Sequence, residues 1–245
     1  MIARPSLPRR ALAEFLGTGL LVAVVVGSGI AAQRLSTDRG LQLLENSTAT
    51  VLGLAALIVL LGPVSGAHFN PAVSLADALL GRRAGTGLPG RTLFVYVFAQ
   101  MAGGIGGAIL ANLMFQVPTA LGSTERANAG TLLGEVIATA GLVLLIAGLV
   151  RAGQSLPVIA AAVGSYIGAA YWFTSSTSFA NPAVTVGRLF TDTFAGIAPA
   201  SVLPFLAAQL LGTALGIAAT IALFPPAKEQ LGVSAPHTPT KDELP

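Results

Sequence analysis

Two copies of one short motif are the residues in this chain that could act on a small molecule. The motif is asparagine, proline and alanine, and it occurs as Asn70, Pro71 and Ala72 and again as Asn181, Pro182 and Ala183. Asparagine is a preferred helix N-cap, and proline at the first helical position loses no hydrogen bond that the helix needs. Each copy therefore predicts the start of a short helix. While its oxygen caps that helix, each asparagine amide can still point N–H donors at a passing oxygen.

The chain lacks the residues that several other kinds of chemistry require. The chain has no cysteine, which excludes disulfides, thiolate metal sites and a cysteine nucleophile. It has no His-Glu-x-x-His pattern, and both lysines lie in the C-terminal tail, so no serine–lysine pair is available within the apolar segments. We therefore expect no enzyme activity, no cofactor and no metal site.

The composition indicates a membrane protein. Of the 245 residues, 53% are hydrophobic and only 9% are charged, whereas soluble domains carry about 25% charged residues. Six apolar windows approach the roughly 20 residues that a helix needs to cross a bilayer: about Ala11–Ala32, Thr48–Val64, Thr92–Phe115, Leu132–Val150, Leu156–Phe173 and Ser201–Phe224. The segments Asn70–Leu80 and Asn181–Phe190 are too short to span and must be interfacial, or re-entrant and buried in protein. The predicted fold class is an all-α protein in a lipid bilayer.

The basic residues indicate membrane topology and no nucleic-acid partner. They lie singly or in pairs between the apolar windows, and the net charge is only +3. If six helices alternate in direction, most basic residues fall on one side, and Arg34, Arg39 and Arg126 fall on the other. The positive-inside rule then predicts that both termini are cytoplasmic. The short loops favour a bacterial inner membrane.

The chain contains an internal repeat. Glu14 opens the first apolar window as Glu135 opens the fourth, and in each half an asparagine motif follows, and then a matching segment, Ala99–Gly103 or Ala208–Gly212. Each half has three crossings, an odd number, so the second copy is inverted relative to the first. The predicted organisation is a single channel domain over 1–225, with repeats at about 11–115 and 132–224, and a flexible cytoplasmic tail over 226–245.

Inverted repeats with broken helices that meet near the midplane form polar paths through bilayers. If the two short helices meet end to end, each N-terminus contributes about +0.5 charge. At about 5 Å and an effective dielectric near 20, the combined positive potential opposes a cation by on the order of 3 kcal/mol. A neutral hydroxyl instead gains a hydrogen bond where an unpaired polar group costs several kcal/mol. The pattern therefore predicts a passive path for small uncharged solutes.

These residues resemble the aquaporin and aquaglyceroporin family. The similarity covers about Ala11 to Phe224 and includes Ser65–Val73 and Phe179–Val184 around the two motifs. The resemblance implies six transmembrane helices and two re-entrant half-helices in an inverted three-plus-three repeat. It also implies a pore in each protomer, a homotetramer and passive conduction.

The sequence departs from the family directly after the second motif. Most members carry arginine there, where this chain has Val184. By the family's spacing from the two asparagines, the constriction falls on Thr50, Ala169, Ser178 and Val184, none of which is bulky, aromatic or charged. Arg188 lies on the same helical face one turn deeper. It could partly replace the missing charge or, as we favour, act as a structural partner for a loop carbonyl or an acid.

Three polar residues near the motifs have two interpretations each. Glu14 and Glu135 can mark an ion or proton path. In the family, however, the equivalent acids brace the re-entrant loops by accepting backbone N–H bonds, which irregular backbone at membrane depth requires. His68 can be a pH gate or can fix a loop through a hydrogen bond. We favour loop bracing for all three.

Two further patterns concern packing and the membrane interface. Small residues four apart predict close helix packing at Gly103 with Gly107 and at Gly212 with Gly216. Tyr171 and Trp172 are predicted for an interfacial aromatic belt.

The small constriction residues favour a channel for glycerol-like polyols and for metalloid hydroxides such as arsenous acid, together with some water. Aquaporin-like channels linked to bacterial arsenic resistance show a similar loss of the arginine. One alternative is a water-selective aquaporin. A secondary transporter is a second and less favoured alternative, since it also uses inverted repeats but needs a coupling-ion site with acids at mid-membrane.

Overall fold

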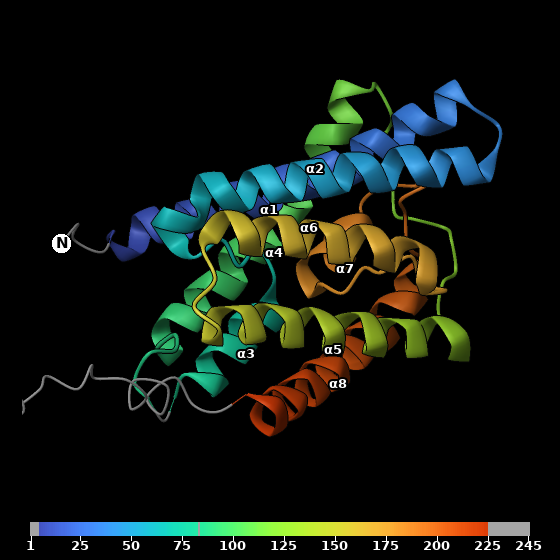
Figure 1. The fold of residues 1–245 in the computed structure, drawn as a ribbon. Helices are drawn as coiled ribbons and strands as arrows, with labels where there is room; N and C mark the ends of the chain where they lie inside the picture. Colours follow the sequence, from blue (N-terminus) through green and yellow to red (C-terminus); the bar gives the residue numbers. More distant parts are fainter. Residues whose placement is uncertain (1–4, 83, 225–245) are drawn as a thin grey trace, which may run out of the picture.

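The computed structural model describes residues 5–82 and 84–224, and these fold into helices and connecting loops (Figure 1). The helices are α1 (Leu7–Leu35), α2 (Arg39–Ser65), α3 (Pro71–Leu80), α4 (Gly90–Met114), α5 (Ala129–Arg151), α6 (Leu156–Phe173), α7 (Pro182–Arg188) and α8 (Pro199–Leu223). Within the described residues, six helices are long and apolar enough to cross a membrane, and α3 and α7 are too short. The predicted fold class is confirmed. The tail predicted over 226–245 lies outside the described residues.

The two halves of the chain pack in the same way. Helix α1 packs along α4 as α5 packs along α8, and α1 contacts α2 as α5 contacts α6. Each half-helix also contacts the last helix of the opposite repeat, α3 against α8 and α7 against α4. Figure 1 shows α3 and α7 between the long helices. The two repeats therefore enclose both half-helices, which is the arrangement that brings the two asparagine motifs together.

Glycines let the paired long helices approach until their backbones touch. A Cβ added at Gly107 of α4 would lie 2.0 Å from the carbonyl oxygen of Gly19 in α1. In the second repeat, a Cβ added at Gly216 of α8 would lie 2.6 Å from the carbonyl oxygen of Ala140 in α5. Both helix pairs thus use the same contact at equivalent positions, and the predicted close packing is confirmed.

The half-helix α7 is held against α4 by a similar contact. A Cβ at Gly104 would lie 2.5 Å from the carbonyl oxygen of Ala183, and a Cβ at Gly187 would lie 2.5 Å from the carbonyl oxygen of Gly104. Because neither glycine has a side chain, α4 fixes the depth of the second motif directly through backbone contact.

Helix α2 begins at Arg39, well before the apolar window that starts at Thr48. Its first turns are polar in sequence, but Asp38 caps them by accepting a hydrogen bond from the backbone N–H of Leu41 at 2.9 Å. Asn46 is buried there and donates to the carbonyl oxygen of Val25 at 2.8 Å. Packing against α1 therefore extends this helix beyond the part that hydropathy predicts.

Candidate functional site

Both asparagine motifs begin a half-helix, as their sequences predict. The Oδ1 atom of Asn70 accepts a hydrogen bond from the backbone N–H of Ala72 at 2.9 Å, and Asn181 caps α7 through Ala183 at 2.9 Å. Proline occupies the first position of both helices. Asn70 is 4% exposed and Asn181 5% exposed. The caps fix both side chains, so the two amide nitrogens have defined positions.

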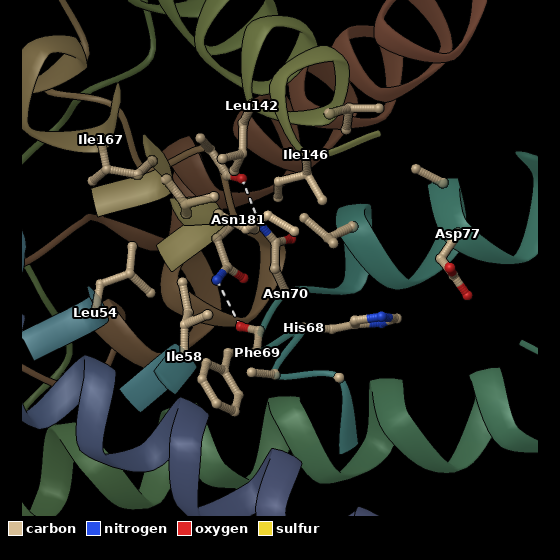
Figure 2. A pocket seen from close by; sticks show the side chains of 18 of the residues that line it. Leu54, Ile58, His68, Phe69, Asn70, Asp77, Leu142, Ile146, Ile167 and Asn181 are labelled. Atoms are coloured by element: carbon tan, nitrogen blue, oxygen red, sulfur yellow. Dashed lines mark hydrogen bonds between the residues drawn. The ribbon is translucent and has the colours of Figure 1, made fainter. Parts of the chain in front are cut away.

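The two motifs bind each other across the repeat boundary. The Nδ2 atom of Asn70 donates to the carbonyl oxygen of Ala180 at 2.8 Å, and the Nδ2 atom of Asn181 donates to the carbonyl oxygen of Phe69 at 2.8 Å. Figure 2 shows both hydrogen bonds and the two amides side by side. An amide nitrogen carries two hydrogens, so each asparagine retains one donor for a solute. This reciprocal pairing is not visible in the sequence, because the partners are main-chain carbonyls of the other half.

Glu14 lies behind the first motif and is fully buried. Its carboxylate accepts hydrogen bonds from the backbone N–H groups of His68 at 3.0 Å and Phe69 at 2.7 Å. It also accepts from the hydroxyl of Ser65 at 2.6 Å and from the amide of Gln100 at 2.8 Å. These donors occupy both carboxylate oxygens, so Glu14 holds the loop that precedes α3.

Glu135 has the equivalent position behind the second motif and is also fully buried. It accepts hydrogen bonds from the backbone N–H groups of Phe179 at 2.8 Å and Ala180 at 2.9 Å, and from the amide of Gln209 at 2.6 Å. Phe69 and Ala180 both have positive φ, near 50° and 47°. Such backbone needs external partners, and the two glutamates supply them.

His68 lies at the edge of the cavity and is only half-buried. Its Nδ1 atom is 3.0 Å from the hydroxyl of Ser74 in α3, and its ring packs edge-on against Tyr96 at 5.7 Å. These contacts connect the loop before α3 with the half-helix and with α4. Figure 2 places His68 beside Asn70 and on the same side as Asp77.

A cavity of about 410 Å³ runs past both asparagines. Apolar side chains from three long helices form most of its wall: Leu54, Ile58, Leu142, Ile146, Val163 and Ile167. Figure 2 shows several of these side chains around the paired amides. At one end, here called the α3 end, the cavity reaches Asp77 and Arg151, and at the other, the α7 end, it reaches Thr50 and Ser178. The asparagine N–H groups are therefore the polar contacts at the middle of an apolar passage.

The α7 end contains three of the four residues that the family's spacing predicts for a constriction. Thr50, Ser178 and Val184 line the cavity there. Ala169 does not, because it is exposed on the outer side of α6. Residues in an α-helix are about 100° apart, so Ala169 lies about 160° from Ile167, which faces the cavity. The spacing therefore misplaces the α6 member of the set.

Tyr171 takes the place that the sequence assigns to Ala169. It is 4% exposed and lines the cavity, and its hydroxyl is 3.1 Å from the hydroxyl of Thr50. The expectation that no aromatic residue lies at this end is therefore wrong. Trp172 is 52% exposed, so only Trp172 fits the predicted aromatic belt. The signal that could have found Tyr171 is the helical spacing of Val163, Ile167 and Tyr171 along one face.

This placement predicts that bulk at position 169 has little effect. Ala169→Phe should leave solute flux in proteoliposomes within about twofold of the unsubstituted chain, since a substitution at an exposed site away from the cavity changes energies by only about 0.5 kcal/mol. The measurement is the rate of vesicle swelling in a glycerol gradient. A severe loss of flux in Ala169→Phe, with the protein still folded, would place residue 169 in the passage and contradict the assignment of Tyr171.

Arg188 also lies at the α7 end, but not deeper than Val184. Helix α7 starts at the paired asparagines and runs outward, so Arg188, its last residue, is one turn farther from the middle of the cavity. It is buried and lines the cavity. Its Nε atom donates to the carbonyl oxygen of Ala195, which is the loop partner favoured on sequence grounds.

Comparisons with known proteins agree with this geometry. A sequence profile described as "Major intrinsic protein" matches residues 1–177. Aquaglyceroporin AqpS of Rhizobium meliloti is 47% identical over 234 residues, which cover 95% of this chain and 97% of AqpS. The glycerol uptake facilitator protein of Pseudomonas aeruginosa is 40% identical over 111 residues, which cover 45% of this chain and 37% of that protein.

The fold is also found in a solved structure. The X-ray structure of the aquaglyceroporin from Plasmodium falciparum matches with a TM-score of 0.67 at 23% identity, over 87% of this chain and 95% of the other. The sequence profile covers more than half of the chain, and the similarity to AqpS extends through the second motif to nearly its full length. From this sequence similarity, and from the paired motifs in an inverted repeat, we conclude that the chain belongs to the major intrinsic protein family.

Proposed function

We propose that this chain is a passive channel for small uncharged solutes, which passes glycerol-like polyols and metalloid hydroxides such as arsenous acid together with some water. The observation that carries this proposal is the cavity past the paired asparagines, whose α7 end has Val184 where most family members have arginine. A small apolar side chain there leaves room for a solute larger than water.

The polar groups at the α7 end suit a solute with several hydroxyls. Thr50 donates its only hydroxyl hydrogen to the carbonyl oxygen of Asn46 at 2.8 Å, so the hydroxyl of Tyr171 must be the donor between the two. Tyr171 then offers a lone pair to a solute hydroxyl. The hydroxyl of Ser178 has no partner among the described residues, but it is sealed from the cavity and so offers nothing to a solute. A polyol or a metalloid trihydroxide can donate to Tyr171 and accept from the two asparagines farther along.

The direct test is swelling of proteoliposomes in separate gradients of glycerol, arsenous acid and an impermeant sugar. We expect glycerol and arsenous acid to enter faster than into empty vesicles, without saturation at millimolar solute. A chain that accelerates only water would be a water-selective aquaporin. Saturation, or dependence on a proton gradient, would indicate a secondary transporter. Either result would contradict the proposal.

Val184→Arg tests the proposed width of the constriction. The added side chain would occupy the α7 end, and we expect it to lower glycerol and arsenous acid flux by about tenfold, equivalent to about 1.4 kcal/mol in the barrier, while water still passes. The measurement is the same swelling assay, with Ala169→Phe as a matched control for added bulk away from the cavity. Unchanged glycerol and arsenous acid fluxes would show that Val184 is not at the constriction.

The assembly and the membrane orientation proposed from the sequence each need an experiment of their own. We propose a homotetramer in a bacterial inner membrane, with both termini on the cytoplasmic side. The predicted charge asymmetry is supported by the arginines at the α3 end, which are Arg9, Arg10, Arg82, Arg91 and Arg151, against Arg34, Arg39 and Arg126 at the opposite end. Native mass spectrometry in detergent would measure the subunit number. Cleavage of terminal tags in inside-out vesicles would measure the orientation.

A further inference from the structure

Arg188 presents a fixed positive charge to the α7 end of the cavity. Its side chain is 3% exposed, and it lines the cavity together with Val184 and Ser178. Its Nε atom donates to the carbonyl oxygen of Ala195, and its Cζ atom lies 3.4 Å from the centre of the Phe179 ring. The hydrogen bond and the stacking together hold the guanidinium in one orientation.

Glu135 attracts this charge electrostatically but does not contact it. Among residues 5–82 and 84–224, Arg188 forms no ion pair, and its Nη1 and Nη2 atoms donate to no protein atom. Neither Nη atom is sealed off, unlike Nη2 of Arg10, which is buried without a partner. Glu135, the buried acid of the same repeat, is already bound by two backbone N–H groups and the amide of Gln209. The Nη hydrogens of Arg188 are therefore available to the cavity.

We propose that Arg188 adds a second barrier to cations, one helical turn beyond Val184, to the barrier at the N-termini of the two half-helices. At about 5 Å and an effective dielectric near 20, one fixed positive charge lowers the occupancy of a monovalent cation by roughly a hundredfold. A neutral solute is not repelled and can accept a hydrogen bond from the guanidinium. The positive charge thus lies one turn farther along α7 than the position where most family members carry arginine. Val184 occupies that position here, and its small side chain keeps the constriction wide. This inference rests on the proposed function, because it requires an open path for neutral solutes.

The competing explanation is that Arg188 only fixes the loop after α7. A second arginine, Arg126, allows the two roles to be separated. Its Nε atom donates to the carbonyl oxygen of Gly196 at 2.7 Å and its Nη2 atom to that of Phe194 at 2.8 Å, and its Cζ atom lies 5.4 Å from the same Phe179 ring. Arg126 is not among the residues that line the cavity. It therefore shares the loop and the ring with Arg188 but not the contact with the passage.

The experiment compares a neutral solute with a cation in the same proteoliposomes. Glycerol entry reports the open channel, and entry of guanidinium ion reports cation passage. We expect guanidinium entry through the unsubstituted chain to be at least about a hundredfold slower than glycerol entry. Arg188→Gln and Arg188→Met should each raise the ratio of guanidinium to glycerol flux by at least about tenfold, a part of the roughly hundredfold electrostatic barrier. Methionine is included because its unbranched side chain can still pack on Phe179.

One control keeps the positive charge at position 188, and the other removes the positive charge of Arg126, which does not line the cavity. Arg188→Lys should keep the ratio low, and Arg126→Gln should leave it unchanged. An unchanged ratio in both neutral variants of Arg188 would overturn the inference, as would an equal rise in Arg126→Gln. If neither neutral variant folds, guanidinium entry through the unsubstituted chain at a rate near that of glycerol would also overturn it. Absence of glycerol entry through the unsubstituted chain would instead contradict the proposed function.

Discussion

Gly107→Val is expected to prevent folding of this chain. Its Cβ would lie 2.0 Å from the carbonyl oxygen of Gly19 and 2.8 Å from the carbonyl carbon, so α1 and α4 would have to separate. Backbone atoms cannot move aside as a flexible side chain can, and we expect a cost of more than about 4 kcal/mol. The measurement is the yield and thermal stability of detergent-solubilised protein, followed by size-exclusion chromatography.

The adjacent glycine provides a matched control. A Cβ at Gly106 would meet nothing within 4 Å, because this residue is on the exposed side of α4. Gly106→Val should therefore change stability by no more than about 0.5 kcal/mol. Equal stability of the two variants would mean that α1 and α4 are not in backbone contact. The expected contrast between neighbouring positions separates a packing effect from the general effect of valine in a helix.

Glu135→Ala is expected to abolish flux and to lower stability strongly. Alanine would leave the backbone N–H groups of Phe179 and Ala180 and the amide of Gln209 without their acceptor. Each buried donor left unpaired costs about 1–3 kcal/mol, so the loss is about 3 kcal/mol or more. For a chain of this size that corresponds to a fall in Tm of roughly 6–12 °C. Glu14→Ala should behave similarly, because Glu14 has the equivalent position in the first repeat.

A matched control replaces an acid elsewhere in the long helices. It tests whether the removal of any carboxylate lowers the flux and the stability. Glu45 in α2 is only half-buried and makes no hydrogen bond through its side chain within the described part of the chain. Glu45→Ala should keep both the Tm and the glycerol flux of the unsubstituted protein. If Glu135→Ala retained normal flux, the carboxylate would not be needed to hold the loop before α7.

Much of the architecture follows from local and repeated features of the sequence. Apolar length predicts the six spanning helices, because a helix must satisfy its own backbone in lipid. The asparagine and proline of each motif predict where both half-helices begin, since capping is a local property. The repeat predicts that the two motifs are related, because each half must bury the same face against the same partners. What hydropathy misses is the polar start of α2, where Asn46 is paired with α1.

The composition of the α7 end was decided by tertiary structure. Counting back from Asn181 leads to Ala169, but the face that α6 turns toward the cavity contains Tyr171, and a shift of two residues reverses the side of a helix. Likewise, the sequence shows that the usual arginine is absent at Val184, but not where the side chain of Arg188 lies. Its place depends on the Phe179 ring and the Ala195 carbonyl, which approach only when α7 and both flanking loops have packed. Local sequence therefore determined the helices and their caps, whereas the orientation of side chains around the passage required contacts between segments far apart in the chain.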